Sequence, residues 1–207
     1  MRELILASGS PRRRELLEQI KVPFRVMVSD AEETVTDTDP GQVVKALAAR
    51  KAIQVAKEIE EGLVLGADTV VSVDGEILGK PKNREDARQM LEKLQGRAHS
   101  VFTGVALVEK QKNDTAQSDT TGGPSDSRVL ENFYRETRVH VHQMSDQEIE
   151  NYLDTGDAFD KAGSYGIQGP FAAFVDGIEG DYNNVVGLPV SAVYQALARV
   201  STDRKRH

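Results

Sequence analysis

The stretch Leu4–Leu17, with the sequence LILASGSPRRRELL, decides how the rest of this chain is interpreted. Its apolar start, Leu4–Ala7, predicts a buried strand, which breaks at the small residues Ser8–Pro11. Ser10 suits a helix N-cap and Pro11 the first helical position, so a helix with three early arginines follows. Backbone N–H groups, hydroxyls and guanidinium groups at one point are what a polyphosphate needs. The alternative is an ordinary strand–helix turn with solvated arginines.

Length and composition are those of an ordinary globular protein. The 207 residues suit one large domain or two small lobes that share a core. Hydrophobic residues make up 39% and charged residues 29%, as in proteins with a packed core and a solvated surface. The net charge of −7 argues against a general nucleic-acid binder, although a local basic cluster is enough for a small anionic ligand.

Features that are absent from the sequence also restrict the function. Cysteine is absent, which excludes disulfides and thiol catalysis. No apolar run has the length of a transmembrane helix, and the start of the chain lacks the pattern of a signal peptide. We therefore expect a cytosolic protein with neither a membrane nor a nucleic-acid partner.

Asp68 is the second informative residue. It lies inside Leu63–Val71, whose continuous aliphatic pattern predicts a central strand buried on both faces. An aspartate there is costly unless it is paired, hydrogen-bonded or bound to a metal, so a metal ligand or a general base is the favoured interpretation. The alternative is an aspartate that caps a turn at the strand end. Gly66 and Ala67 leave room for a ligand or another backbone.

Three other charged positions precede the middle of the chain. Lys80 stands between a glycine and a proline, so it is less free than most lysines and could reach a phosphate. Lys51 lies in an amphipathic helix that opens at Asp39–Pro40, where a lysine is uninformative by itself. Glu32 follows a strand over Phe24–Val28 and could bind a metal, but a solvated acidic loop is the favoured interpretation.

Asp160–Gly169 is the third informative stretch. Its three glycines and its Tyr–Ile pair suit a loop that closes on a ligand, with a structural glycine-rich loop as the equal alternative. Gln168 can donate and accept at once, as the reading of a base edge requires. Phe171–Val175 then predicts a strand, Gly180–Asn184 a turn, and Ser191 the start of the last helix.

Between these stretches, the chain alternates helices and strands. A helix from Asn83 to Leu94 and a capping box at Ser145–Glu148 are clear local signals. His99–Val108 predicts a strand interrupted at Thr103–Gly104. The polar segment Lys110–Arg128 predicts a flexible hairpin insertion.

Four pieces of the chain, taken in order, resemble the Maf family of nucleoside triphosphate pyrophosphatases. Each piece alone is a weak signal, whereas the set in register is specific. The likeness covers nearly the whole chain except the insertion and the last residues, which favours a single domain over residues 1–207. The pieces are Ala7–Arg13, Gly66–Val71, Gly79–Pro81 and Asp160–Gly169, and His99–Val105 and Asn184–Pro189 also match.

The resemblance implies an α/β fold of the Maf/ITPase-like kind, often as a homodimer. This fold has a long curved mixed sheet with helices on its faces and two lobes around a cleft. The resemblance also implies hydrolysis of a nucleoside triphosphate between the α and β phosphates, giving a monophosphate and pyrophosphate, with a divalent cation such as Mg²⁺ or Mn²⁺. Action on some modified pyrimidine nucleotides, and hence a house-cleaning role, is implied as well.

Position by position, the resemblance assigns roles to six residues within the quoted motifs and to Lys51 and Glu32 outside them. The base-selecting positions have the pattern of the branch that prefers dTTP and UTP rather than the branch that prefers 7-methyl-GTP. The catalytic set is Ser8, Arg12, Lys51, Asp68 and Lys80; the metal ligands are Asp68 and Glu32; the base-selecting set is Arg12, Thr69 and Gln168.

The chemistry of these residue types fits that activity. Attack at the α-phosphorus builds negative charge, which Arg12, Lys51, Lys80 and a metal would neutralise. Asp68 would activate the attacking water directly or through the metal. Two alternatives stay open: a nucleotidyltransferase, for which no second site is evident, and a nucleotide-binding regulator of cell division with little turnover, which would not need Asp68.

Overall fold

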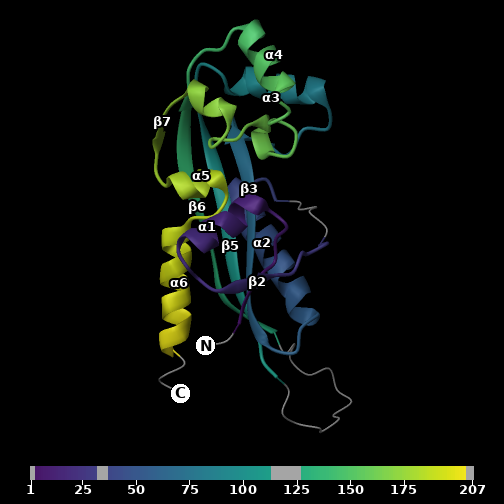
Figure 1. The fold of residues 1–207 in the computed structure, drawn as a ribbon, viewed down its shortest axis with the longest axis vertical. Coiled ribbons are helices and arrows are strands. Elements are labelled where there is room, and N and C mark those ends of the chain that lie inside the picture. Colours follow the sequence, from purple (N-terminus) through teal and green to yellow (C-terminus); the bar gives the residue numbers. More distant parts are fainter. Residues whose placement is uncertain (1–2, 32–36, 113–126, 204–207) are drawn as a thin grey trace.

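The computed structural model describes residues 3–31, 37–112 and 127–203, which form a seven-stranded mixed sheet with helices on both faces (Figure 1). The strand order is β2-β1-β3-β5-β6-β7, and β4 pairs with β3. β1 runs parallel to both of its neighbours, and the remaining pairs are antiparallel. The strands are β1 (Leu4–Leu6), β2 (Phe24–Val26), β3 (Gly62–Val73), β4 (Glu76–Leu78), β5 (Ala98–Lys110), β6 (Ser127–Val141) and β7 (Val175–Glu179).

Helices α2, α3 and α4 begin at the residues that the sequence signals indicate. Asp39 and Asn83 cap their helices by accepting from Gln42 N and Asp86 N, and the capping box at Ser145 is formed. The helices are α1 (Pro11–Gln19), α2 (Pro40–Lys57), α3 (Arg84–Leu94), α4 (Asp146–Asp154), α5 (Tyr182–Val186) and α6 (Val190–Asp203), with 3₁₀ turns at Ala162–Ser164 and Pro170–Phe174. Within the described residues, no helix is long and apolar enough to span a membrane.

The end of β1 is the point where the chain changes direction across the sheet. From β1, helix α1 leads to β2 on one side, and α2 then leads to β3 on the other side. β1 pairs with β3 only up to the Leu6–Leu65 pair, so β3 from Gly66 to Val70 has no partner strand on that side among the described residues. In α/β sheets, ligands bind at such a switch point, outside the carboxyl end of the strands.

Helix α2 packs directly on the sheet at two glycines. A Cβ atom at Gly66 of β3 would lie 2.1 Å from Ala48 O, and one at Gly104 of β5 would lie 2.2 Å from Val44 O. The space that the sequence predicts beside Gly66 is thus filled by helix backbone. The predicted interruption of β5 at Thr103–Gly104 is wrong, because β5 pairs continuously with β3 there and the glycine serves close packing.

Two further predictions are wrong near the C-terminus. Apart from Val175, which begins β7, Phe171–Val175 is no strand: it forms most of the 3₁₀ turn Pro170–Phe174, in which Phe171 is buried against Tyr165 while Ala172 and Ala173 are exposed. Gly180–Asn184 is more than a turn, because Asp181 accepts from Asn183 N and starts the short helix α5. Of the predicted insertion Lys110–Arg128, residues 113–126 lie outside the described part of the chain.

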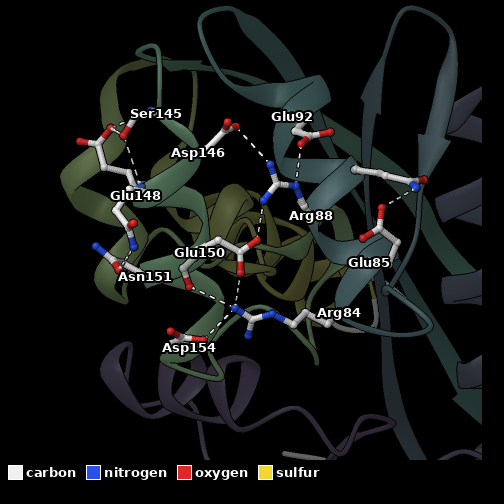
Figure 2. Close-up of polar contacts among 12 residues, drawn as sticks. Arg84, Glu85, Arg88, Glu92, Ser145, Asp146, Glu148, Glu150, Asn151 and Asp154 are labelled. Carbon is white, nitrogen blue, oxygen red and sulfur yellow. Dashed lines mark hydrogen bonds and ion pairs between the residues drawn. The ribbon is translucent and has the colours of Figure 1, made fainter.

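Helices α3 and α4 form one end of the molecule and are joined by a network of ion pairs (Figure 2). Arg84 and Arg88 of α3 both donate to Glu150 of α4, and the two hydrogen bonds hold the pKa of Glu150 below its usual value. Arg88 also reaches Asp146, and Arg84 reaches Asp154. Helix α3 follows the segment that carries Lys80, and α4 precedes the Asp160–Gly169 loop. The ion pairs between the two helices therefore hold together the helices next to these two segments.

Candidate active site

A cavity of about 840 Å³ lies at the switch point beside the unpaired edge of β3. Its walls come from the β1–α1 turn, from β3, from the Gly79–Lys80 segment and from the loop that follows α4. Cationic side chains outnumber carboxylates among the residues that line it, which favours an anionic ligand. The charged lining residues are Arg12, Arg13, Lys51, Lys80, Lys161, Asp68, Asp157 and Asp160.

Lys51 and Asp68 form an ion pair across the cavity wall. The distance between Lys51 Nζ and Asp68 Oδ1 is 2.6 Å, and each side chain is only 12% exposed. Side chains alternate along β3, so Asp68 faces α2, on the same side of the sheet as Gly66. The close approach of α2 at Gly66 brings Lys51, three residues after Ala48 on that helix, to this carboxylate. The pair therefore depends on the glycine contact.

Arg13 connects three parts of the cavity wall. Its guanidinium group donates to Ser8 Oγ at 3.1 Å, to Thr69 Oγ1 at 3.1 Å and to Gly187 O at 2.9 Å. Thr69 lies on the α1 face of β3, opposite to Asp68, which is why a residue of α1 reaches it. Arg13 fixes the turn hydroxyl and the strand hydroxyl relative to one another.

Arg12 points to a different partner. Its Nη1 atom lies 3.2 Å from Asp160 Oδ2 in the loop after α4. Lys161 pairs with Asp160 at 2.6 Å and with Asp157 at 3.0 Å. Burial raises the pKa of Asp160, but hydrogen bonds from Lys161 and Arg12 outweigh it and leave the pKa below the usual value. The two sides of the cavity are thus joined through Arg12.

The loop after α4 is built around small residues. A Cβ atom at Gly169 would lie 2.8 Å from Asp157 Oδ2, and one at Gly163 would lie 2.8 Å from a methyl group of Val71. Gly163 N also donates to Gly79 O at 3.0 Å, which joins this loop to the segment that carries Lys80. The glycines of the predicted closing loop are needed for tight packing against the rest of the cavity.

Tyr165 anchors the same loop to the sheet. Its hydroxyl lies 2.7 Å from Nε2 of His99 on β5, and both residues are buried. Burial lowers the pKa of His99 to about 4 and raises the pKa of Tyr165, so both groups are neutral near pH 7. The imidazole and the phenol form an uncharged contact under the loop that carries Gln168.

Residues 3–200 match the family model described as Maf-like protein. The chain belongs to the Maf family. It is 45% identical to a protein of Agathobacter rectalis named dTTP/UTP pyrophosphatase, over 98% of this chain and 100% of that protein. It is 48% identical to one of the same name from Bacillus cytotoxicus, over 95% of each chain. The structure of the Ham1 protein of Staphylococcus aureus is a distant likeness: 18% identity and a TM-score of 0.42, over 67% of this chain and 71% of that one.

The structure brings together seven of the eight residues that the sequence singles out for the Maf-family site. Glu32 lies outside the described residues. Lys80 and Gln168 are exposed at the cavity, and Lys80 makes no ion pair to a described residue. The residues that line the cavity are Ser8, Arg12, Lys51, Asp68, Thr69, Lys80 and Gln168.

Sequence reasoning missed several residues of this Maf-family cavity. Arg13 was visible only as one of three consecutive arginines, and the helical turn of about 100° per residue sends it away from Arg12. Asp157 lies outside every motif. Asp160 and Lys161 lie in a quoted motif, but nothing in their spacing indicates a contact with Arg12. Within the described residues, no three His, Cys, Asp or Glu side chains group into a metal site.

Proposed function

We propose that this protein hydrolyses dTTP and UTP between the α and β phosphates, releasing a nucleoside monophosphate and pyrophosphate. The observation that carries the proposal is the Lys51–Asp68 pair, held in the wall of one cavity with Arg12, Lys80 and Ser8. A carboxylate beside several cations suits an in-line displacement at phosphorus. The two Maf-family relatives named dTTP/UTP pyrophosphatase support the same pair of nucleotides.

In this mechanism Asp68 acts on the attacking water. Lys51 holds Oδ1, and Oδ2 makes no hydrogen bond to a described residue, so Oδ2 can accept the proton of a water. Lys80 and Arg12 offset the charge that develops on the phosphate oxygens and on the departing pyrophosphate. The backbone N–H groups at the start of α1 add further donors for a phosphate.

The cavity offers a carboxylate that could bind a divalent cation, Mg²⁺ or Mn²⁺. Mg²⁺ in nucleotide sites is commonly bound through one or two carboxylates, with substrate phosphate oxygens and waters as the other ligands. Asp68 offers such a carboxylate, and Glu32 remains a proposed second ligand. When bound, the cation would neutralise phosphate charge and acidify a coordinated water. Asp68 would then act as its ligand rather than as the direct base.

We assign recognition of the base to Arg12, Thr69 and Gln168, all three of which line the cavity. Some modified pyrimidine nucleotides would be accepted as well, in a house-cleaning role. A homodimer belongs to the same proposal, and light scattering after size exclusion would test it at the expected mass of about twice 22.7 kDa.

The test is product analysis on a panel of canonical nucleoside triphosphates with Mg²⁺ or Mn²⁺. We expect pyrophosphate and monophosphate from dTTP and UTP, and slower release from the other nucleotides. Release of inorganic phosphate instead of pyrophosphate would contradict the assigned bond. Binding without any release would favour the regulator interpretation.

A further inference from the structure

The hydrogen-bond partners of the hydroxyl groups in the cavity wall determine whether each hydroxyl can still donate to a ligand or accept from it. A hydroxyl group has one hydrogen to donate and two lone pairs that accept, so its remaining capacity follows once its partners are known. Ser8 and Thr69 are the two cavity hydroxyls that Arg13 contacts. Their other partners differ, and the difference gives the two hydroxyls opposite roles.

Ser8 is left with a hydrogen to donate. Its Oγ atom accepts from Arg13 Nη1 at 3.1 Å and from Ser10 N at 3.2 Å, which occupies both lone pairs. Its hydrogen has no acceptor among the residues that the structure describes. An acceptor from the ligand, such as a phosphate oxygen, therefore suits this position.

Thr69 is left with a lone pair. Its Oγ1 atom accepts from Arg13 Nη2 and lies 3.0 Å from Thr103 Oγ1. The hydroxyl of Thr103 donates its single hydrogen to Asn184 O, at 2.8 Å, and both Thr103 and Asn184 are completely buried. A buried carbonyl oxygen needs a donor, so Thr103 keeps this direction and Thr69 must donate to Thr103. What Thr69 still offers is one acceptor lone pair.

The Thr69 hydroxyl faces the cavity beside Gly187. A Cβ atom at Gly187 would lie 3.6 Å from Thr69 Oγ1, and both residues line the cavity. The absence of a side chain at Gly187 therefore leaves room for a ligand atom next to the hydroxyl. Thr103 itself does not line the cavity, so it can act on a ligand only through Thr69.

We propose that Thr103 is a positioning residue that makes Thr69 an obligate hydrogen-bond acceptor, and that this acceptor selects the N3–H group of uracil and thymine over the N3 lone pair of cytosine. The inference rests on the proposed function, because it assumes that Thr69 contacts the base. Two facing acceptors would leave cytosine N3 unpaired in the cavity, which penalises the wrong base.

The chain offers matched variants for a test. Thr103→Val keeps the shape of the side chain but removes the hydroxyl that takes the Thr69 hydrogen. Thr103→Ser keeps that hydroxyl. Thr137→Val removes a different buried hydroxyl, which bonds to Asn184 Nδ2 at 3.1 Å but does not contact Thr69. The comparison separates two effects: a change in the direction of the Thr69 hydrogen, and a general loss of packing around α5.

The measurement is kcat/KM for UTP and for CTP, from pyrophosphate release, in the native protein and the three variants. We expect the native ratio of UTP to CTP to fall at least about tenfold in Thr103→Val, because the freed Thr69 hydrogen can then donate to cytosine N3. Thr103→Ser should restore the native ratio, and Thr137→Val should affect both nucleotides equally.

Several results would overturn the inference. A native ratio in Thr103→Val, or an equal loss of ratio in Thr137→Val, would refute it while leaving the proposed function intact. If Thr69 contacts a ribose hydroxyl instead, the kcat/KM values for UTP and CTP will change in parallel in Thr103→Val, which would also refute the inference. If Thr103→Val does not fold, Thr69→Val, which removes the acceptor, must lower the same ratio. A native protein that releases no pyrophosphate from any nucleotide would refute the proposed function and the inference together.

Discussion

Lys51 Nζ lies 2.6 Å from Asp68 Oδ1, and this pair joins the helix α2 to the unpaired edge of β3. Both side chains are largely buried, so removal of either partner breaks a largely buried ion pair. The pair is therefore both a support of the cavity wall and the centre of the proposed chemistry.

Lys51→Met should lower kcat for UTP by at least about tenfold, because the cation that orients Asp68 and offsets phosphate charge is lost. Lys51→Arg should retain part of the activity, since it keeps the charge at a different geometry. Steady-state kinetics would measure this. The matched control is Lys57→Met in the exposed last turn of the same helix, where we expect native rates. Equal losses in both methionine variants would contradict the role of Lys51.

Asp160→Asn should lower the KM for the nucleotide by about two- to fivefold at low salt, with kcat unchanged. Asp160 is mostly exposed and cancels positive charge from Arg12 and Lys161 at the cavity mouth, so its removal strengthens attraction of a polyphosphate. The effect should shrink as salt is added. Asp154→Asn, in the α3–α4 network away from the cavity, is the control. A raised KM in Asp160→Asn would show that the pair positions Arg12 instead.

Gly104→Ala should destabilise the protein by several kcal/mol, because its Cβ atom would lie 2.2 Å from Val44 O and would push α2 off the sheet. Activity should fall with stability, since α2 carries Lys51. Thermal unfolding would measure the loss. Gly177→Ala on β7 has no atom within 4 Å of its Cβ and should be close to native in stability. Similar melting temperatures for both variants would refute the close contact.

The stability of the protein should fall between about pH 6.5 and pH 4 through His99. The pKa of His99 is about 4 in the folded chain and 6.5 in the reference state, so the unfolded chain binds the extra proton in this range. The loss is about 3 kcal/mol at most, complete below pH 4 and absent above pH 6.5. Denaturant unfolding at several pH values would measure it, and His99→Gln should have a flatter profile. An unchanged slope in that variant would assign the acid sensitivity to other groups.

Much of the fold follows from local sequence signals. Leu4–Ala7 followed by Ser10 and Pro11 predicts β1 and α1, and the capping residues predict where α2, α3 and α4 begin. These signals are local, because a cap or a proline acts within one turn of helix. The alternation along β3 puts Asp68 and Thr69 on opposite faces, but only the helices packed there determine their partners.

What the sequence could not predict depends on long-range packing. Gly104 resembles a break in a strand, yet it is the place where α2 meets the sheet. Phe171 starts a strand-like apolar run, yet its burial against Tyr165 makes a 3₁₀ turn. The proposed role of Thr103 could not be predicted from its position in the sequence, because that role requires Thr69 and Asn184 to lie beside it.

The most direct test of the account is pyrophosphate release from UTP and dTTP by Asp68→Asn compared with the native protein. The amide keeps the shape of the side chain but neither accepts a proton readily nor binds a metal as a carboxylate does. We expect a loss of at least about 100-fold in kcat, with a cooperative unfolding transition retained. Turnover by Asp68→Asn close to that of the native protein would contradict the central role of Asp68.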